Sequence, residues 1–289
     1  MVFSIRAVCA VMTALLALLP ATAWAAPTVD APPQLRAAAD RVRDTNVTAL
    51  EAVIRRAGLA LPVDIRVTLI PDDDARAASV PEWIVGLAFG ERDIVIFADR
   101  VVSYPYDSLE SVVRHEVVHL ALNAAAAGGE LPRWFHEGVA TSVDVGWGIG
   151  AQVRLAAAMI RRPDEASLGR LFASGQESEA REAYLLSAVL IEDVRRRHGD
   201  DVPGSIARRV GAGMSFEQAF SAATGESPAA AALQAWDAYR RWTAWIPAIT
   251  SASATWALIL LLAFAAYAAQ LRRRWRRRRE WDTDDGTLL

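Results

Sequence analysis

Five consecutive residues of this 289-residue chain form the pattern H-E-x-x-H: His115, Glu116, Val117, Val118 and His119. Residues four apart lie on the same face of a helix, so the two imidazoles can reach one metal ion. The glutamate between them is the group that takes a proton from a water molecule in sites of this pattern. We therefore expect His115 and His119 to bind Zn²⁺ and Glu116 to be catalytic.

Two classes of H-E-x-x-H protein are excluded by the neighbouring residues. The metzincin pattern continues as H-E-x-x-H-x-x-G-x-x-H, but Leu122 and Ala125 occupy the positions of its glycine and third histidine. An intramembrane protease would carry the motif inside an apolar span, whereas Glu110 and Arg114 flank it here. The third zinc ligand must come from another part of the chain.

A second motif follows a break of small residues at Ala124–Gly129. Leu131–Ala140 reads L-P-R-W-F-H-E-G-V-A, with Glu137 placed 18 positions after the second histidine of the first motif. Together, H-E-x-x-H and P-R-W-x-x-E-G-x-A resemble the gluzincin peptidases, in particular the compact bacterial peptidase MA-like group. The resemblance covers about residues 63–242, includes a strand–Gly–strand lead-in around Gly86, and implies that Glu137 is the third zinc ligand.

His136 leaves an alternative open for that ligand, because it adjoins Glu137 and is one of only four histidines. Neighbouring residues of a helix point about 100° apart, so only one of the two can face the zinc. The family pattern places the ligand at Glu137, and His136 is then a surface group or a neighbour of the ligands.

Peptide hydrolysis also requires a donor for the oxyanion that develops on the carbonyl. The resemblance implies that Tyr184, on a later helix, is this donor; a tyrosine of the core is the competing interpretation. Thr141 and Asp144 are candidates for hydrogen bonds to the ligand imidazoles; a place on the polar outer face of the helix is the favoured alternative for Asp144. His198 follows three arginines and is expected at an exposed helix end, and the resemblance implies that strand Asp93–Ala98 is an edge strand that aligns an extended substrate.

Hydrophobic periodicity predicts an α+β domain in which a small N-terminal sheet precedes a mainly helical part, as in a gluzincin-like domain. Strands are expected at Val63–Ile70, Trp83–Phe89 and Asp93–Ala98, the last two as a hairpin around Gly90. Asp107 and Glu110 predict a capping box that starts the H-E-x-x-H helix, ending near Leu122. The other expected helices are Gln34–Gly58, Pro132–Val145, Gly150–Arg161, Ser178–Arg197, Ser215–Thr224 and Pro228–Trp245.

The two ends of the chain are apolar. Residues 1–25 have the pattern of a secretory signal peptide, which is either cleaved after Ala25 or kept as an anchor. Residues 249–271 are uncharged and about long enough to cross a ~30 Å hydrocarbon core, which predicts one C-terminal transmembrane helix. Arg272–Arg279 contains seven arginines, which predicts a cytoplasmic tail at 272–289 that contacts anionic lipid.

These patterns predict an extracytoplasmic domain at 26–248, tethered by a single span to a bacterial-type inner membrane and exposed to the periplasm or the exterior. The net charge is −3, and the arginine-rich tail leaves the rest of the chain acidic, so a nucleic-acid partner is not expected. The expected function is zinc-dependent hydrolysis of peptide or protein substrates. The alternative is a metal-binding scaffold without turnover, which would not need Glu116.

Overall fold

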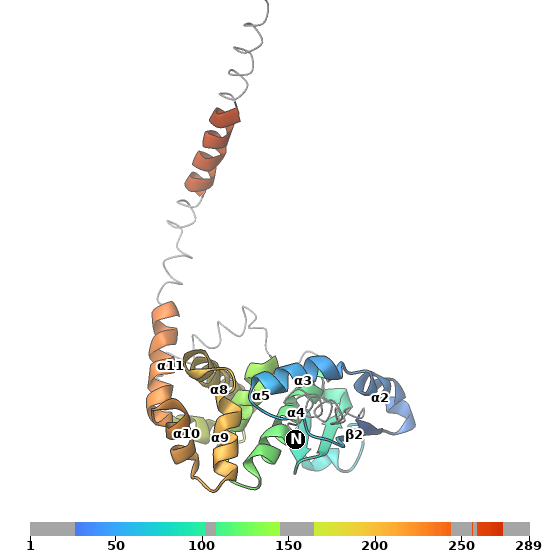
Figure 1. Ribbon diagram of the computed structural model, residues 1–289. Coiled ribbons are helices and arrows are strands. Elements are labelled where there is room, and N and C mark those ends of the chain that lie inside the picture. The colour runs from blue at the N-terminus through green and yellow to red at the C-terminus, as the bar shows by residue number, and fades with distance from the viewer. Residues whose placement is uncertain (1–26, 102–107, 145–164, 244–255, 257–258, 274–289) are drawn as a thin grey trace, which may run out of the picture. The chain divides into compact units, whose positions relative to one another are not determined.

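The computed structural model describes residues 27–101, 108–144, 165–243, 256 and 259–273 (Figure 1). The chain divides into two compact units, Met1–Ala235 and Trp236–Leu289. The first unit contains a four-stranded sheet followed by helices, as the predicted α+β class requires. The predicted signal peptide, the predicted helix at 150–161 and residues 274–289 of the arginine-rich tail lie outside the described residues.

The sheet has the strand order β1-β2-β4-β3. The first three are parallel to one another, and β3 is antiparallel to β4, which confirms the predicted hairpin. Gly90 takes a positive φ of 57° in the turn, a conformation that glycine adopts without strain. The strands are β1 (Thr28–Asp30), β2 (Arg66–Ile70), β3 (Gly86–Phe89) and β4 (Asp93–Phe97). The edge strand of the hairpin is therefore β3, and the prediction that residues 93–98 form the edge was wrong.

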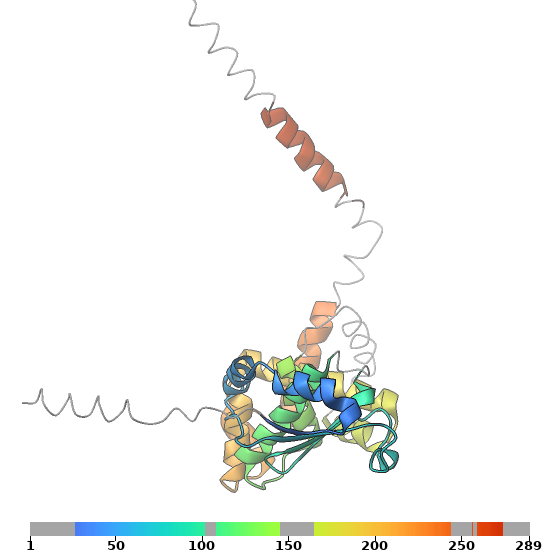
Figure 2. The ribbon, with the colours of Figure 1, turned by 90° about the vertical axis from the view of Figure 1, so that its right-hand side faces the viewer.

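One face of the sheet is buried beneath helices. The register places Val67 beside Ile94 and Leu69 beside Ile96, and all four side chains are at most 1% exposed. Helix α4 (Leu109–Ala126) packs against β3 and β4. Helix α2 (Arg36–Arg43) packs against β1 and α4, and is seen in blue above the strands in Figure 2.

The other face of the sheet is covered by the segment 77–84, which leads into β3. A buried cluster of Ile70, Ala77 and Phe97 packs there with Ile84 and Leu87. Arg100 binds the backbone of this segment. The buried guanidinium of Arg100 donates hydrogen bonds of 3.0–3.4 Å to several carbonyl oxygens of the segment, and it also pairs with a carboxylate 2.6 Å away. The carbonyls are those of Ala77, Val80, Pro81 and Ile84, and the carboxylate is that of Asp72.

Most of the predicted helices are present with shifted ends. The helix expected at 34–58 is broken in two, because Asn46 caps the second half by accepting a hydrogen bond from the Ala49 backbone N–H. The remaining helices are α3 (Val47–Arg56), α5 (Arg133–Asp144), α7 (Glu165–Ala173), α8 (Glu177–His198), α9 (Val202–Gly211), α10 (Phe216–Thr224) and α11 (Pro228–Thr243). Strand β1 and helices α7 and α9 were not predicted.

The predicted transmembrane helix is not supported. Among the described residues, no helix combines the length and the apolar character needed to cross a membrane. The fold class that included this helix and the single-pass inner-membrane location are corrected accordingly.

Candidate metal centre

Helix α4 places two imidazoles in the protein interior. Ser108 and Ser111 form a capping box at its start, with the Ser108 hydroxyl accepting a hydrogen bond of 3.2 Å from the Ser111 backbone N–H. The predicted box of Asp107 and Glu110 is therefore replaced by one that starts a residue later, and Asp107 lies outside the described residues. Because most of α4 is core, His115 is only 2% exposed.

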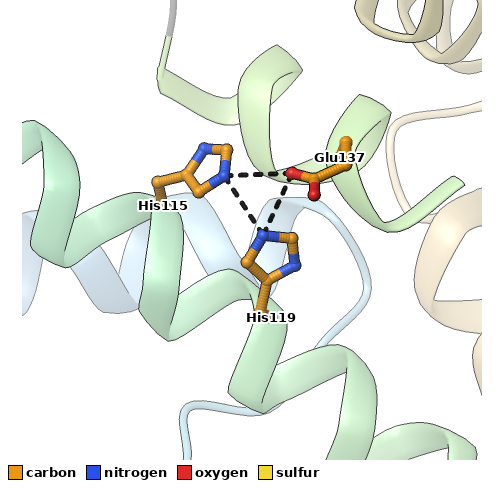
Figure 3. Close-up of side chains that lie close together, drawn as sticks. All are labelled: His115, His119 and Glu137. Atoms are coloured by element: carbon orange, nitrogen blue, oxygen red, sulfur yellow. Dashed lines mark hydrogen bonds and ion pairs between the residues drawn. The ribbon is translucent and has the colours of Figure 1, made fainter. Parts of the chain in front are cut away.

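Helix α5 brings a carboxylate against α4. The Pro132 carbonyl accepts hydrogen bonds from the Phe135 and His136 backbone N–H groups, and so begins the helix. Gly138 lets α5 approach α8 closely, because a Cβ at this position would lie 2.6 Å from the Ser187 carbonyl oxygen. With its glycine face against α8, α5 directs Glu137 toward the two histidines of α4 (Figure 3).

The three side chains meet in a small triangle. The Nε2 atoms of His115 and His119 are 3.1 Å apart. Glu137 Oε2 lies 3.4 Å from the first of these atoms and 3.3 Å from the second (Figure 3). This buried group could therefore hold a metal ion, as the sequence predicted for these three residues.

The environment of Glu137 fits a metal ligand. Its Oε2 atom is buried and accepts no hydrogen bond from the described residues, whereas its Oε1 atom faces Arg133 Nε at 3.6 Å. Burial alone would raise the pKa of this carboxyl, but the imidazoles of His119 and His115 outweigh burial and hold the pKa well below its usual range. The side chain therefore stays ionised and offers one oxygen to a cation.

A cavity of about 360 Å³ opens beside the triangle. Glu116 lines this cavity although it is only 3% exposed. Burial, partly opposed by the charge of His119, raises the pKa of Glu116 to about 7. A carboxyl with this pKa can both accept and release a proton near neutral pH.

Tyr184 and His136 also line the cavity. The Tyr184 ring lies 6.5 Å from the His115 ring, measured between centroids, and burial beside Glu137 raises the pKa of its hydroxyl well above the usual value. Tyr184 is thus a neutral hydrogen-bond donor at the cavity wall. His136 is outside the group of converging ligand atoms, and burial beside His119 lowers its pKa to about 4. The structure therefore favours Glu137 over His136 as the third ligand.

The remaining predicted residues lie elsewhere. His198 ends α8 in an ion-pair network, where its Nε2 is 3.2 Å from Glu226 Oε1, and it does not line the cavity. Thr141 is buried on α5. The Asp144 side chain lies outside the described residues.

Several cavity residues were not predicted as site residues. Strand β3 and the segment before it form one wall, and Arg133 with three residues of α8 forms part of another. The α8 residues are Glu177, Arg181 and Tyr184, of which only Tyr184 was predicted. Their spacing of four and three is that of one helix face, which is a sequence signal that could have grouped them. Nothing in the sequence indicated that Asn123 donates a 2.7 Å hydrogen bond to the Gly90 carbonyl, which ties α4 to the hairpin.

The chain matches no protein-family model and no curated protein sequence. The resemblance to the gluzincin peptidases therefore rests on the two sequence motifs.

Proposed function

We propose that the chain is a zinc metallopeptidase of the gluzincin type. The observation that carries this proposal is the presence of Glu116 in the cavity beside the triangle of His115, His119 and Glu137. A metal-binding scaffold would need the triangle alone, whereas hydrolysis also needs a base at this position.

The size of the triangle supports zinc as the metal. Tetrahedral Zn²⁺ at ~2.0–2.1 Å from nitrogen and oxygen ligands separates those ligands by about 3.3–3.4 Å. The distances between the three ligand atoms are 3.1, 3.3 and 3.4 Å. Two histidines and one glutamate leave a fourth position for water or substrate, as in catalytic rather than structural zinc sites. When bound, Zn²⁺ polarises the substrate carbonyl and lowers the pKa of the attacking water.

The side chains of the cavity have matching roles. Glu116 accepts the proton of the attacking water and passes it to the leaving amine, which its pKa of about 7 allows. Tyr184 keeps its proton, because burial raises its pKa, and donates a hydrogen bond to the developing oxyanion. Arg133 faces the outer oxygen of Glu137 and directs the other oxygen toward the histidines.

An extended peptide is the expected substrate. Strand β3 is the edge of the sheet and forms one wall of the cavity. Phe97 N–H donates to the Val85 carbonyl, so the backbone N–H and C=O groups of Val85 and Leu87 point toward β4, and those of Gly86 and Ala88 point away from β4. The Gly86 groups and the Ala88 carbonyl can pair with the backbone of a substrate, whereas the Ala88 N–H acts on Glu116.

The test compares the purified full chain with Glu116→Gln, using zinc analysis and a broad peptide library. Hydrolysis should fall by about 10²–10⁴-fold in the variant, because the amide cannot accept the proton. Zinc content should stay near one equivalent, since Glu116 is not a ligand. Glu110→Gln, on the same helix but outside the cavity, should retain full activity.

Two results would favour the scaffold. The first is a zinc-loaded wild-type chain that cleaves no peptide of the library. The second is equal cleavage by Glu116→Gln and wild type.

A further inference from the structure

Gly86 marks the closest approach of strand β3 to Glu116. A Cβ added at Gly86 would lie 2.4 Å from Glu116 Oε1, 2.8 Å from its Cδ and 2.9 Å from its Cγ. Carbon atoms in van der Waals contact are about 3.5–4.0 Å apart, so no side chain fits here while Glu116 keeps its place.

The sheet register explains why this position faces α4. Gly86 pairs with Ile96 and Ala88 pairs with Ile94, and both isoleucines belong to the buried face on which α4 packs. The Ala88 backbone N–H also acts on the Glu116 carboxylate and lowers its pKa, against the larger effect of burial. The carboxylate therefore lies against the edge strand at Gly86.

Backbone conformation is not the reason for glycine at this position. Gly86 is absent from the positive-φ residues of the described chain, so its backbone is open to any residue. Most other close approaches at described glycines involve backbone or aliphatic atoms, such as Ser187 at Gly138 and Val210 at Gly129. A glycine inside a strand commonly marks a place where another group comes close, and here that group is a buried carboxylate of the cavity.

We infer that Gly86 is a positioning residue for Glu116. Because glycine has no side chain, the Glu116 carboxylate has room to lie against β3 and to face the cavity. The effect on catalysis rests on the proposed function. The packing relation between the two residues does not, and it can be tested without metal or substrate.

The first experiment is a thermal-unfolding cycle on the metal-free full chain. Gly86→Ala should lower Tm by about 2–10 °C, the range expected for one excess methyl in a packed interior. In a Glu116→Ala background the same substitution should have little effect on Tm, because the conflicting carboxylate is gone. Gly169→Ala on α7, where a Cβ meets no atom within 4 Å, is the control and should shift Tm equally in both backgrounds.

The second experiment measures peptide hydrolysis by the zinc-loaded chain. Gly86→Ala should lower kcat about 100-fold, the loss typical of a catalytic group moved by about 1 Å, with KM and zinc content unchanged. Combined with Glu116→Gln, it should cause no further loss.

The outcomes separate the two proposals. An equal fall in Tm in both backgrounds, or no fall in wild type, overturns the role of Gly86 whatever the activity. A rise in KM with kcat unchanged also overturns it, because Gly86 would then act on the substrate. A wild type without peptidase activity refutes the proposed function, and the thermal cycle still decides the packing relation.

Discussion

Two clusters of histidine, glutamate and arginine lie in the first unit, and they are built differently. The first is the metal centre, in which His115, His119 and Glu137 converge on one buried point. The second is the ion-pair network at the end of α8, in which Arg197 Nε lies 2.7 Å from Asp193 and the same guanidinium contacts Glu226.

The difference lies in what the carboxylates face. In the ion-pair network, Asp193 pairs with two arginines, and Glu226 pairs with Arg197 and His198. In the metal centre, Glu137 Oε2 is buried without a hydrogen bond from any described residue. Similar residue types thus form a network of arginine–carboxylate pairs in one place, and in the other a group whose ligand atoms converge on one point where a metal ion could bind.

The largest effect should follow from removing a ligand. His119→Ala or Glu137→Ala should abolish stoichiometric zinc retention, because two protein ligands hold Zn²⁺ far less tightly than three. His198→Ala, which removes the histidine of the ion-pair network, should retain one equivalent. Elemental analysis after dialysis measures the zinc bound per chain. Full zinc content in both ligand variants would contradict the assignment of these residues as zinc ligands.

Tyr184→Phe should reduce hydrolysis by about 10- to 1000-fold, because one oxyanion donor is commonly worth up to ~10³ in rate. The phenylalanine ring retains the packing against Phe172, 5.4 Å away between centroids, so zinc content and Tm should hardly change. Steady-state kinetics with one good peptide substrate provide the measurement. An unchanged kcat would contradict the role of Tyr184 as the oxyanion donor and would favour its interpretation as a tyrosine of the core.

In the metal-free chain, Glu116 should make stability depend on pH. Its folded pKa of about 7 is above the ordinary value of 4.5, so its contribution is complete below about pH 4.5 and is lost as the pH rises through 7. Glu116→Gln cannot titrate. The unfolding free energy of this variant relative to wild type should increase by about 2 kcal/mol between pH 5 and pH 8. Chemical denaturation at both pH values measures the difference, and a constant value would contradict the buried placement of Glu116.

The smallest effect is expected in the ion-pair network. Glu226→Gln should lower the free energy of unfolding by about 1–2 kcal/mol, less than for a fully buried pair, since the Arg197 side chain is 24% exposed. Zinc retention should be unchanged. A loss of zinc in this variant would mean that the two clusters are coupled, and the contrast between them would no longer hold.

The two histidines of the metal centre could be predicted from the sequence because they are four residues apart on one helix. Glu137 lies 18 positions later on another helix, and it was predicted only from the resemblance to the gluzincin motif. The geometry of each helix then fixes which side chains share a face. Residues that reach the cavity through sheet pairing carried no such signal: Gly86 faces Glu116 only because β3 pairs with β4 in one register.

The strands and helices with strong hydrophobic periodicity were predicted. A short strand that forms only because a neighbouring strand pairs with it was missed. Thr28–Asp30 was not predicted as a strand, yet it pairs with β2 in a parallel register. Three residues carry too little pattern to indicate a strand without the neighbour that completes their hydrogen bonds. Similarly, a single helix was expected over 34–58, but Asn46 caps a second helix in the middle of this range. Asparagine acts as an N-cap only where the backbone leaves the helical conformation, and the sequence pattern alone did not indicate that position.

The contact between Arg100 and the segment 77–84 has a consequence for how the wall of the cavity can change by mutation. Arg100 binds carbonyl oxygens of this segment, and carbonyl oxygens are the same in every residue type. Trp83 and Ile84 line the cavity from this segment. None of these bonds involves Trp83, so substitutions at this position can reshape the wall of the cavity while the bonds to Arg100 stay in place. Under the proposed function, a library that randomises Trp83 while keeping Arg100 should yield variants with altered cleavage preference.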